Sequence, residues 1–201
     1  MDPPAGRRER KKAQTRDALA DAALRLFLER GYDGVSLNDI ADAADVSVTT
    51  LFKHFPGGKE TLVFDQESDR EASLVAAVQA RAPGQSILGA LRDFLAPHQK
   101  IKADHRPEFQ RFLDLIQGTP ALRAYSQKMW RRHEDALARA ICAETGAPEG
   151  DIRARALARY AIEAVNLAQE YPDPTAALME IFELLERGWS GAGARRRAPR
   201  S

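Results

Sequence analysis

Apolar residues recur at helical spacing along most of the chain, and proline and glycine divide them into separate segments. The first predicted helix begins after Arg7 and ends at Gly31, a residue suited to a helix C-terminus, with Tyr32 placed to close against Phe27. Its apolar face consists of Leu19, Ala22, Ala23, Leu26 and Phe27. No strand pattern persists for more than a few residues, so an all-α fold is predicted.

Residues 36–55, SLNDIADAADVSVTTLFKHF, predict two short helices joined by a tight turn. Ser36, followed by Asp39 three residues later, forms the pattern of a capping box. Ser47 is placed to cap the second helix, and Val46 is spaced to pack on Leu51 as a hydrophobic staple. A staple fixes the direction in which the second helix starts, as a helix-turn-helix requires for entry into a DNA major groove.

The second short helix has two different faces. Val48, Leu51 and Phe55 fall on an inward side, and Thr49, Thr50, Phe52 and Lys53 fall outward or on the flanks. Hydroxyls, one aromatic ring and one cation can approach base edges and phosphates closely. The alternative for this segment alone is an ordinary helical hairpin whose outer face meets only water.

Beyond Lys59 the pattern predicts further helices at about 59–81, 86–102, 107–118, 120–146, 151–171 and 174–189. The last two helices carry faces that suit a dimer interface: Ala154, Leu157, Ala158, Ala161, Ala164, Val165 and Ala168 on one, and Leu178, Ile181, Phe182, Leu185 and Trp189 on the other. The alternative is that both faces close the core of their own chain.

The segment LFLERGYDGVSLNDIADAADVSVTTLFKHFPGGKETL resembles the N-terminal DNA-binding domain of the TetR family of bacterial repressors. The matching residues are Phe27, Gly31-Tyr32, Ser36, Ile40-Ala41, Ala44, Val46-Ser47, Thr50-Leu51-Phe52, His54-Phe55, Lys59-Glu60 and Leu62. The resemblance covers about the first third of the chain. It implies a three-helix helix-turn-helix domain followed by a helical bundle for ligand binding and dimerisation.

The resemblance also implies functions for single residues. Asn38 and Val48 would reach bases, and Thr49, Thr50 and Lys53 would face the groove or its phosphates. Three further positions, Phe52, His54 and Lys59, would contact the DNA backbone. The implied function is a transcriptional regulator, in the form of a repressor, released from a palindromic operator by a small and largely apolar effector.

Several positions depart from the family pattern. Phe52 stands where tyrosine is usual and lacks the hydroxyl that would bond a phosphate. Asp45 replaces the usual turn glycine and must adopt a left-handed or similarly tolerant conformation. Thr49 stands where glycine is common, and the gap between Phe55 and Lys59 is one residue longer than usual.

Charge is balanced overall but unevenly distributed. Lys and Arg total 30 against 29 for Asp and Glu, giving a net charge of +1. Basic residues cluster near both ends of the chain: Arg7, Arg8, Arg10, Lys11, Lys12 and Arg16 at the start, and Arg195, Arg196, Arg197 and Arg200 in the tail. The first cluster is expected to supply most of the phosphate neutralisation, with a solvated, disordered arm as the alternative.

These patterns divide the chain into four parts: a basic N-terminal arm at 1–16, a helix-turn-helix domain at 17–62, a helical ligand-binding and dimerisation domain at 63–189, and a disordered basic tail at 190–201. Candidate effector-binding residues share aromatic or apolar character with a few polar groups: Phe94, His98, Phe109, Phe112, Ile116, Tyr125, Met129, Trp130, His133 and Asn166. A stripe of this kind is also compatible with an ordinary core, with His133 hydrogen-bonded inside it.

Other functional classes have little support. We find no glycine-rich phosphate loop, nucleophile elbow or helical metal motif, so we expect no enzyme, no cofactor and no metal. His98 and His105 form at most a weak metal pair, and Cys142 stands alone. No signal peptide or membrane-spanning run is recognised, and a cytoplasmic protein is expected. Besides the DNA-binding regulator and the enzyme, a third hypothesis is a helical structural or partner-binding protein without DNA activity.

Overall fold

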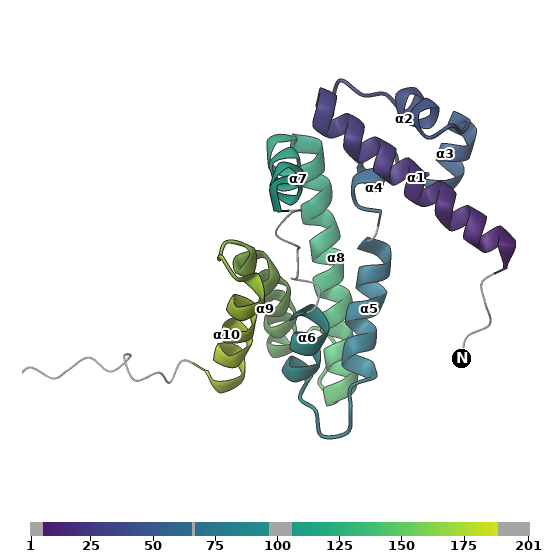
Figure 1. Ribbon diagram of the computed structural model, residues 1–201. Coiled ribbons are helices and arrows are strands. Elements are labelled where there is room, and N and C mark those ends of the chain that lie inside the picture. Colours follow the sequence, from purple (N-terminus) through teal and green to yellow (C-terminus); the bar gives the residue numbers. More distant parts are fainter. Residues whose placement is uncertain (1–5, 66, 97–105, 189–201) are drawn as a thin grey trace, which may run out of the picture. The chain divides into compact units, whose positions relative to one another are not determined.

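The computed structural model describes residues 6–65, 67–96 and 106–188, and these residues form ten α-helices and no strand (Figure 1). The helices are α1 (Arg7–Arg30), α2 (Leu37–Ala43), α3 (Val48–His54), α4 (Lys59–Val63), α5 (Glu67–Gln79), α6 (Ile87–Leu95), α7 (Arg106–Gly118), α8 (Pro120–Thr145), α9 (Ile152–Gln169) and α10 (Pro174–Arg187). The all-α prediction is confirmed for the described residues. None of their helices is long and apolar enough to cross a bilayer.

The chain divides into two compact units. The first contains α1 to α4, α7, and α8 as far as Met129. The second contains α5 from Asp69 onward, α6, the part of α8 that starts at Trp130, α9 and α10. The first unit is therefore larger than the predicted helix-turn-helix domain, because α7 and the start of α8 belong to it.

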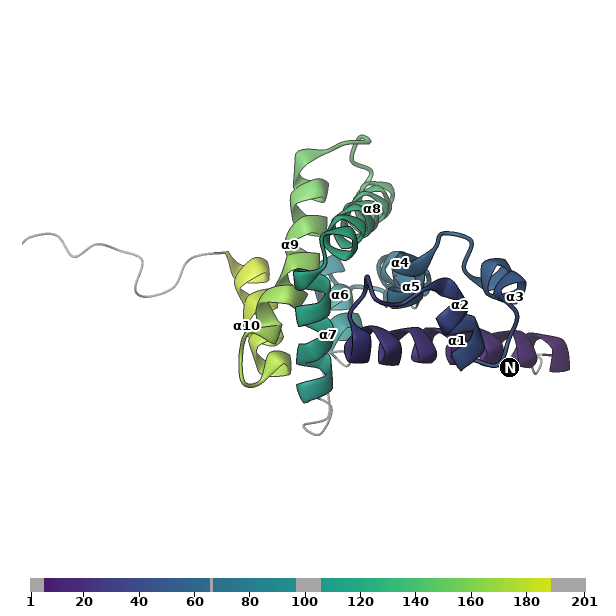
Figure 2. The same ribbon diagram turned by 90° about the horizontal axis from the view of Figure 1, so that it is seen from above.

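The first unit has an apolar core to which α1, α2 and α3 all contribute. In it α2 packs against α1, and α3 packs against α2 (Figure 2). Its fully buried side chains include Leu19, Phe27, Ile40, Leu51, Phe55, Leu62 and Leu122. The predicted closure at the end of α1 is present: Gly31 has φ +76°, and the rings of Phe27 and Tyr32 lie 5.1 Å apart. Burial of such large side chains supplies most of the stability of these short helices.

The caps of α2 and α3 are built as the sequence predicts. The Ser36 hydroxyl accepts the Asp39 N–H at 3.2 Å, and the Asp39 carboxylate accepts the Ser36 N–H at 2.8 Å. The Ser47 hydroxyl accepts the Thr50 N–H at 3.1 Å and so caps α3. Asp45, between the helices, is the non-glycine residue of the described chain with positive φ, at 53°.

The single helix predicted for 59–81 is wrong, because the structure ends α4 at Val63 and starts α5 at Glu67. Phe64, directly after α4, has φ −111° and ψ 37°, which is outside the helical region. Its ring stacks on Tyr125 of α8 at 5.4 Å, and Asp65 is ion-paired with Arg16 of α1. These tertiary contacts outweigh the helical propensity of the segment.

Residues 7–16 of the predicted basic N-terminal arm are helical, in agreement with the helix predicted to begin after Arg7. They form the first turns of α1, and the first buried residue of that helix is Leu19. At a rise of about 1.5 Å per residue, roughly 18 Å of helix precedes this point. The basic residues are therefore held on a regular helix from Arg7 onward.

In the second unit, α9 packs against α10, and both contact α6. The small residues of α9 predicted for a dimer interface, such as Ala158 and Ala161, are buried in this unit's own core together with Leu178 and Phe182 of α10. The buried residues of these faces thus close the core of their own chain, as the alternative interpretation expected, and Trp189 lies outside the described residues. Different apolar residues are exposed on this pair and its connection: Ile152, Tyr160, Leu167, Tyr171, Met179 and Leu184.

Candidate nucleic-acid interface

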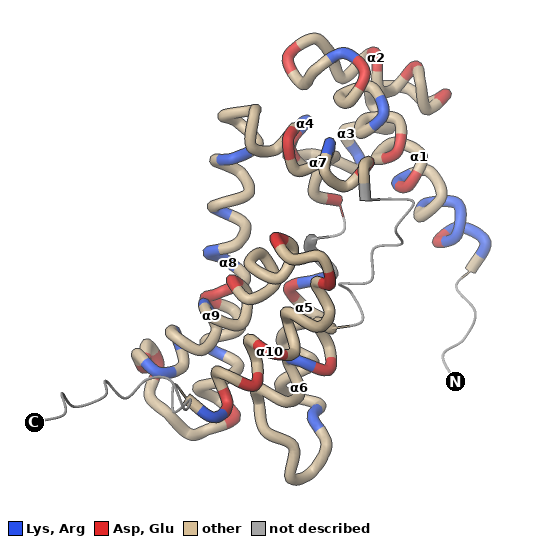
Figure 3. The backbone as a smooth tube through the Cα atoms, turned by 60° about the vertical axis from the view of Figure 1, so that its left-hand side comes forward, with Lys and Arg blue, Asp and Glu red and all other residues tan. Residues whose placement is uncertain are grey.

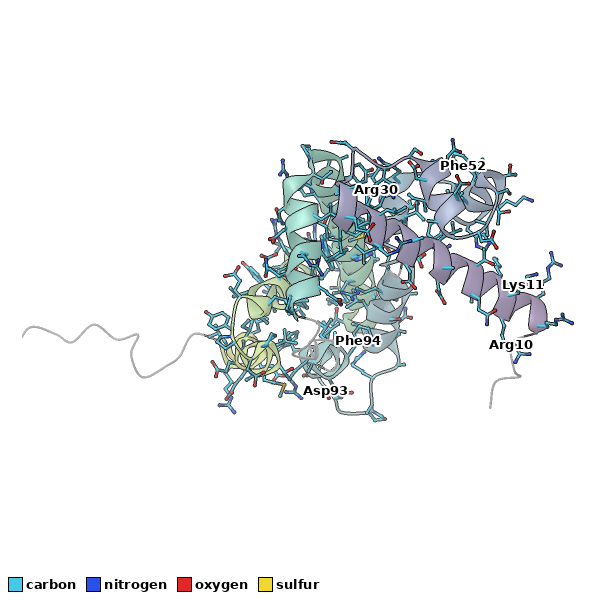
Figure 4. All side chains as sticks on the ribbon, turned by 45° about the horizontal axis from the view of Figure 1, so that its top comes forward. Arg10, Lys11, Arg30, Phe52, Asp93 and Phe94 are labelled. Atoms are coloured by element: carbon cyan, nitrogen blue, oxygen red, sulfur yellow. The ribbon has the colours of Figure 1, made fainter. Side chains whose placement is uncertain are left out.

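The outward face of α3 is exposed to solvent, and its inward face is buried in the core of the first unit. Leu51 and Phe55 are 0% and 1% exposed, so the helix is anchored on one side. Thr49, Phe52 and Lys53 are exposed on the other side, and Figure 4 shows Phe52 at the surface of this part of the chain. The separation of faces predicted from the sequence is confirmed.

The remaining predicted base-reading residues occupy less open positions. Val48 is half-buried and packs against the core, while Asn38 is exposed on α2. The Thr50 hydroxyl lies 2.9 Å from the Ser47 hydroxyl, so it takes part in the cap of α3. A DNA contact by Thr50 would share this hydroxyl between the cap and the DNA.

His54 closes the C-terminal turn of α3 in a half-buried position. Its Nδ1 is buried without a hydrogen-bond partner among the described residues. Burial is the main cause that lowers the pKa of His54 below 6.5, and the positive charges of Arg16 and Lys12 lower it further. The imidazole of the free protein is therefore neutral at neutral pH, with two cations in its surroundings.

Lys59 has contacts that the sequence did not indicate. Its Nζ donates to the carbonyl oxygens of Tyr32 at 2.7 Å and Val35 at 2.8 Å. The same atom lies 4.1 Å from the centre of the Tyr32 ring. Lys59 therefore links the loop between α1 and α2 to the start of α4. A phosphate contact by Lys59, as predicted from the sequence, would have to form while these two hydrogen bonds are kept.

Basic residues gather at the start of α1, and acidic residues are frequent on α2 (Figure 3). Arg7, Arg8, Arg10, Lys11 and Lys12 are all exposed, and Figure 4 shows Arg10 and Lys11 projecting from the end of the helix. Arg16 differs from this group, because it contacts His54, Phe55 and Asp65 inside the first unit. Nothing in the local sequence pattern distinguishes Arg16 from its basic neighbours.

The predicted effector residues fall in both units. In the first unit, Ile116 and Met129 are buried, Tyr125 stacks on Phe64, and Phe109 lies 6.3 Å from Phe112. An open hollow of about 230 Å³ in this unit is lined by Phe27, Leu28, Arg111, Asp114 and Leu115, none of which was predicted to bind the effector.

In the second unit, Phe94 and Trp130 pack against the core, and His133 is 1% exposed with its ring 5.4 Å from Trp130. The Arg132 guanidinium donates to the Glu71 carboxylate at 2.7 Å, and the His133 Nε2 lies 3.8 Å from the same carboxylate. Asn166 is exposed and donates to Glu163 at 3.3 Å, so it lies outside this core. His98 lies outside the described residues.

The described residues contain no group of three or more side chains suited to hold a metal ion. His105, the other member of the weak metal pair in the sequence, lies outside them together with the basic tail. The features of the first unit that could contact DNA are the exposed face of α3 and the basic start of α1.

Comparison with known proteins agrees with this geometry. A sequence model of the bacterial regulatory proteins of the tetR family matches residues 19–65, and a model of the MftR C-terminal domain matches residues 85–190. The HTH-type transcriptional regulator TcmR of Streptomyces glaucescens is 32% identical over 157 residues, which cover 75% of this chain and 69% of TcmR. The chain belongs to the TetR family, and it is a DNA-binding transcriptional regulator and not an enzyme.

Solved structures show the same fold. NalD of Pseudomonas aeruginosa, the secondary repressor of the MexAB-OprM multidrug efflux pump, has a TM-score of 0.59 at 23% identity, covering 89% of this chain and 96% of NalD. Salmonella enterica GusR has a TM-score of 0.58 at 16% identity, covering 86% and 94% of the two chains. At these identities the similarity establishes the architecture and leaves operator and effector to be determined.

Proposed function

We propose that this regulator is a homodimeric repressor that reads a palindromic operator with α3 and is released by a small, largely apolar effector. The observation that carries the proposal is the exposed face of α3, with Thr49, Phe52 and Lys53 supported by buried Leu51 and Phe55. A capped two-turn helix fixed in this manner is suited to enter a major groove. The exposed cations at the start of α1 add contacts with phosphates.

Two recognition helices are needed to read a palindrome, and a dimer supplies them at a spacing of about one helical turn of DNA or a multiple. The exposed apolar side chains of α9 and α10 are the candidate contact between the two copies. An effector would act by binding more tightly to the conformation in which the two helices do not match the operator.

The DNA part of the proposal can be tested with duplexes that the purified protein selects from a random-sequence pool. We expect one palindromic sequence to emerge and to bind tightly in fluorescence anisotropy, with affinity falling as salt rises. Lys53→Ala should weaken binding and reduce the slope of log K against log salt by about 1. Lys128→Ala, which removes an exposed cation from α8, is the matched control and should change little.

Selection of no sequence, together with weak binding to every duplex, would reject sequence-specific recognition and favour the partner-binding alternative. If an operator is obtained, release of the labelled duplex provides the screen for effectors. We expect apolar and aromatic compounds to release the DNA, and Phe94→Ala or Trp130→Ala to reduce their effect without weakening DNA binding. Release by strongly polar compounds alone would contradict the proposed effector class.

A further inference from the structure

Arg16 occupies a position unlike the other basic residues of α1. Its Nη1 donates to the His54 carbonyl oxygen at 3.0 Å, and its Nε lies 2.5 Å from the Asp65 carboxylate. The guanidinium carbon also lies 4.6 Å from the centre of the Phe55 ring. One side chain thus contacts the last residue of α3, the residue that follows it and the turn after α4.

The contact with His54 completes the C-terminal end of α3. A helix leaves its last four carbonyl groups without helical partners, and α3 has only seven residues. The Phe55 N–H bonds the Leu51 carbonyl, and the Arg16 guanidinium bonds the His54 carbonyl. A cation at this end also interacts favourably with the helix dipole. The recognition helix is therefore capped by Ser47 at its start and by Arg16 at its end.

Asp65 holds Arg16 in this geometry. Its side chain is only 12% exposed, so its carboxylate would be costly to bury without a cationic partner. The planar guanidinium can bond a carboxylate through one edge and a carbonyl through another while its face lies on an aromatic ring. A lysine ammonium at the same position has the charge but not this combination of contacts.

We propose that Arg16 is a positioning residue that holds the C-terminal end of the recognition helix through the anchor Asp65, and that it is not a phosphate-binding cation. This inference rests on the proposed recognition of an operator by α3. It separates Arg16 from the exposed cations before it, which remain available for phosphates. Arg16, Asp65 and the His54 carbonyl together form the latch of α3.

The latch and a phosphate contact predict opposite effects for Asp65→Asn. If Arg16 served only as a positive charge, removal of a nearby carboxylate would strengthen DNA binding by reducing repulsion of the phosphates. If Asp65 anchors the latch, its neutralisation loosens the end of α3 and weakens operator binding. Asp21→Asn removes the same charge from an exposed position of α1 and serves as the matched control.

The experiment measures binding of the full-length protein to its selected operator duplex by anisotropy over a salt series. We expect Asp65→Asn and Arg16→Lys each to weaken binding about tenfold, with an unchanged salt slope. The double variant should be little weaker than either single variant, because both changes break the same contact. Asp21→Asn should bind as tightly as the wild type or slightly more tightly.

Tighter binding by Asp65→Asn, or wild-type affinity in Arg16→Lys, would overturn the latch. A salt slope reduced by about 1 in Arg16→Ala would instead identify a phosphate contact. Circular dichroism and the urea midpoint of each variant show whether the fold is intact, and Arg16→Lys keeps the charge if Asp65→Asn proves unstable. Failure of the wild type to select any operator would reject the proposed function itself, an outcome distinct from failure of the latch.

Discussion

The Phe52 side chain contributes little to the core of the first unit. It is 48% exposed on α3, whereas Leu51 beside it is completely buried. Phe52→Tyr adds a hydroxyl to a ring already placed on the proposed DNA-facing side. We expect operator binding to tighten by a few-fold to tenfold, because a hydrogen bond to a charged group contributes about 1.5–3 kcal/mol before the cost of ordering is subtracted. Anisotropy with the selected duplex measures the change.

We expect the stability of the Phe52→Tyr variant to be unchanged, because the ring is 48% exposed and the added hydroxyl can be hydrated in the free protein. Phe52→Leu is the complementary control, since it keeps an apolar side chain but removes the ring and should weaken binding. Equal affinity of all three proteins would mean that position 52 lies away from the DNA backbone.

Asp45 carries backbone strain that glycine would relieve. Its φ of 53° lies in the left-handed region, which aspartate tolerates better than most residues but less well than glycine. Asp45→Gly should stabilise the protein by up to about 1 kcal/mol, and Asp45→Ala should destabilise it by a similar amount. Urea denaturation of the three proteins tests the order, and a less stable glycine variant would contradict it.

The residues that could be predicted from the sequence are those whose partners are near in the chain. Ser36 and Ser47 bond backbone groups three residues away, so a short pattern is enough to recognise them. Arg16 and Lys59 bond partners 38 and 24 to 27 residues away, and no local pattern specifies those contacts. The sequence therefore predicts the positive charge of these two residues but not the contacts that they make within the fold.

At the scale of elements, α2 owes part of its stability to an ionised cap. The Ser36 hydroxyl, followed by the Ser36 N–H, lowers the pKa of Asp39 below 3.8. The ionised carboxylate thus stabilises the folded state at pH values above 3.8, and this contribution is lost as the pH falls through the lowered pKa of Asp39. Asp39→Asn should lower the urea midpoint at neutral pH, and the difference from wild type should shrink in acid.

Asp42→Asn is the control for this prediction, because it lies on the same helix but takes no part in the capping box. Its midpoint should follow that of the wild type across the same pH range. A difference between Asp39→Asn and wild type that stays constant into acid would show that the charge of Asp39 does not contribute through the cap.

Helix boundaries could be predicted where a proline or glycine interrupts the apolar pattern, and not where tertiary contacts end the helix. Pro120 and Pro174 begin α8 and α10 as predicted, because proline is favoured in the first turn of a helix. The break after Val63 has no proline or glycine, and it arises from the stacking of Phe64 on Tyr125 and the ion pair of Asp65 with Arg16. Contacts of this type are set by the tertiary fold, so the sequence predicted one helix where there are two.

At the scale of the whole molecule, the exposed apolar residues of α9 and α10 form the surface that we propose binds a second copy. The core faces of these helices were evident from helical periodicity, and they close the second unit's own core. Tyr160 and Leu167 of α9 also recur at helical spacing, but the alanines at that spacing are more numerous, and Tyr171 lies just after the end of the helix. Large hydrophobic side chains at such spacing on an exposed face are typical of a subunit interface.

Leu167→Glu should therefore convert the dimer to a monomer, because a carboxylate buried in an apolar interface would be strongly unfavourable. Sedimentation velocity measures the assembly, and anisotropy should show loss of operator affinity, since one recognition helix alone binds only a half-site. Phe52→Glu is the matched control: the same charge on α3 should abolish operator binding while the dimer persists. A Leu167→Glu protein that remains dimeric with full affinity would place the interface on another surface of the chain.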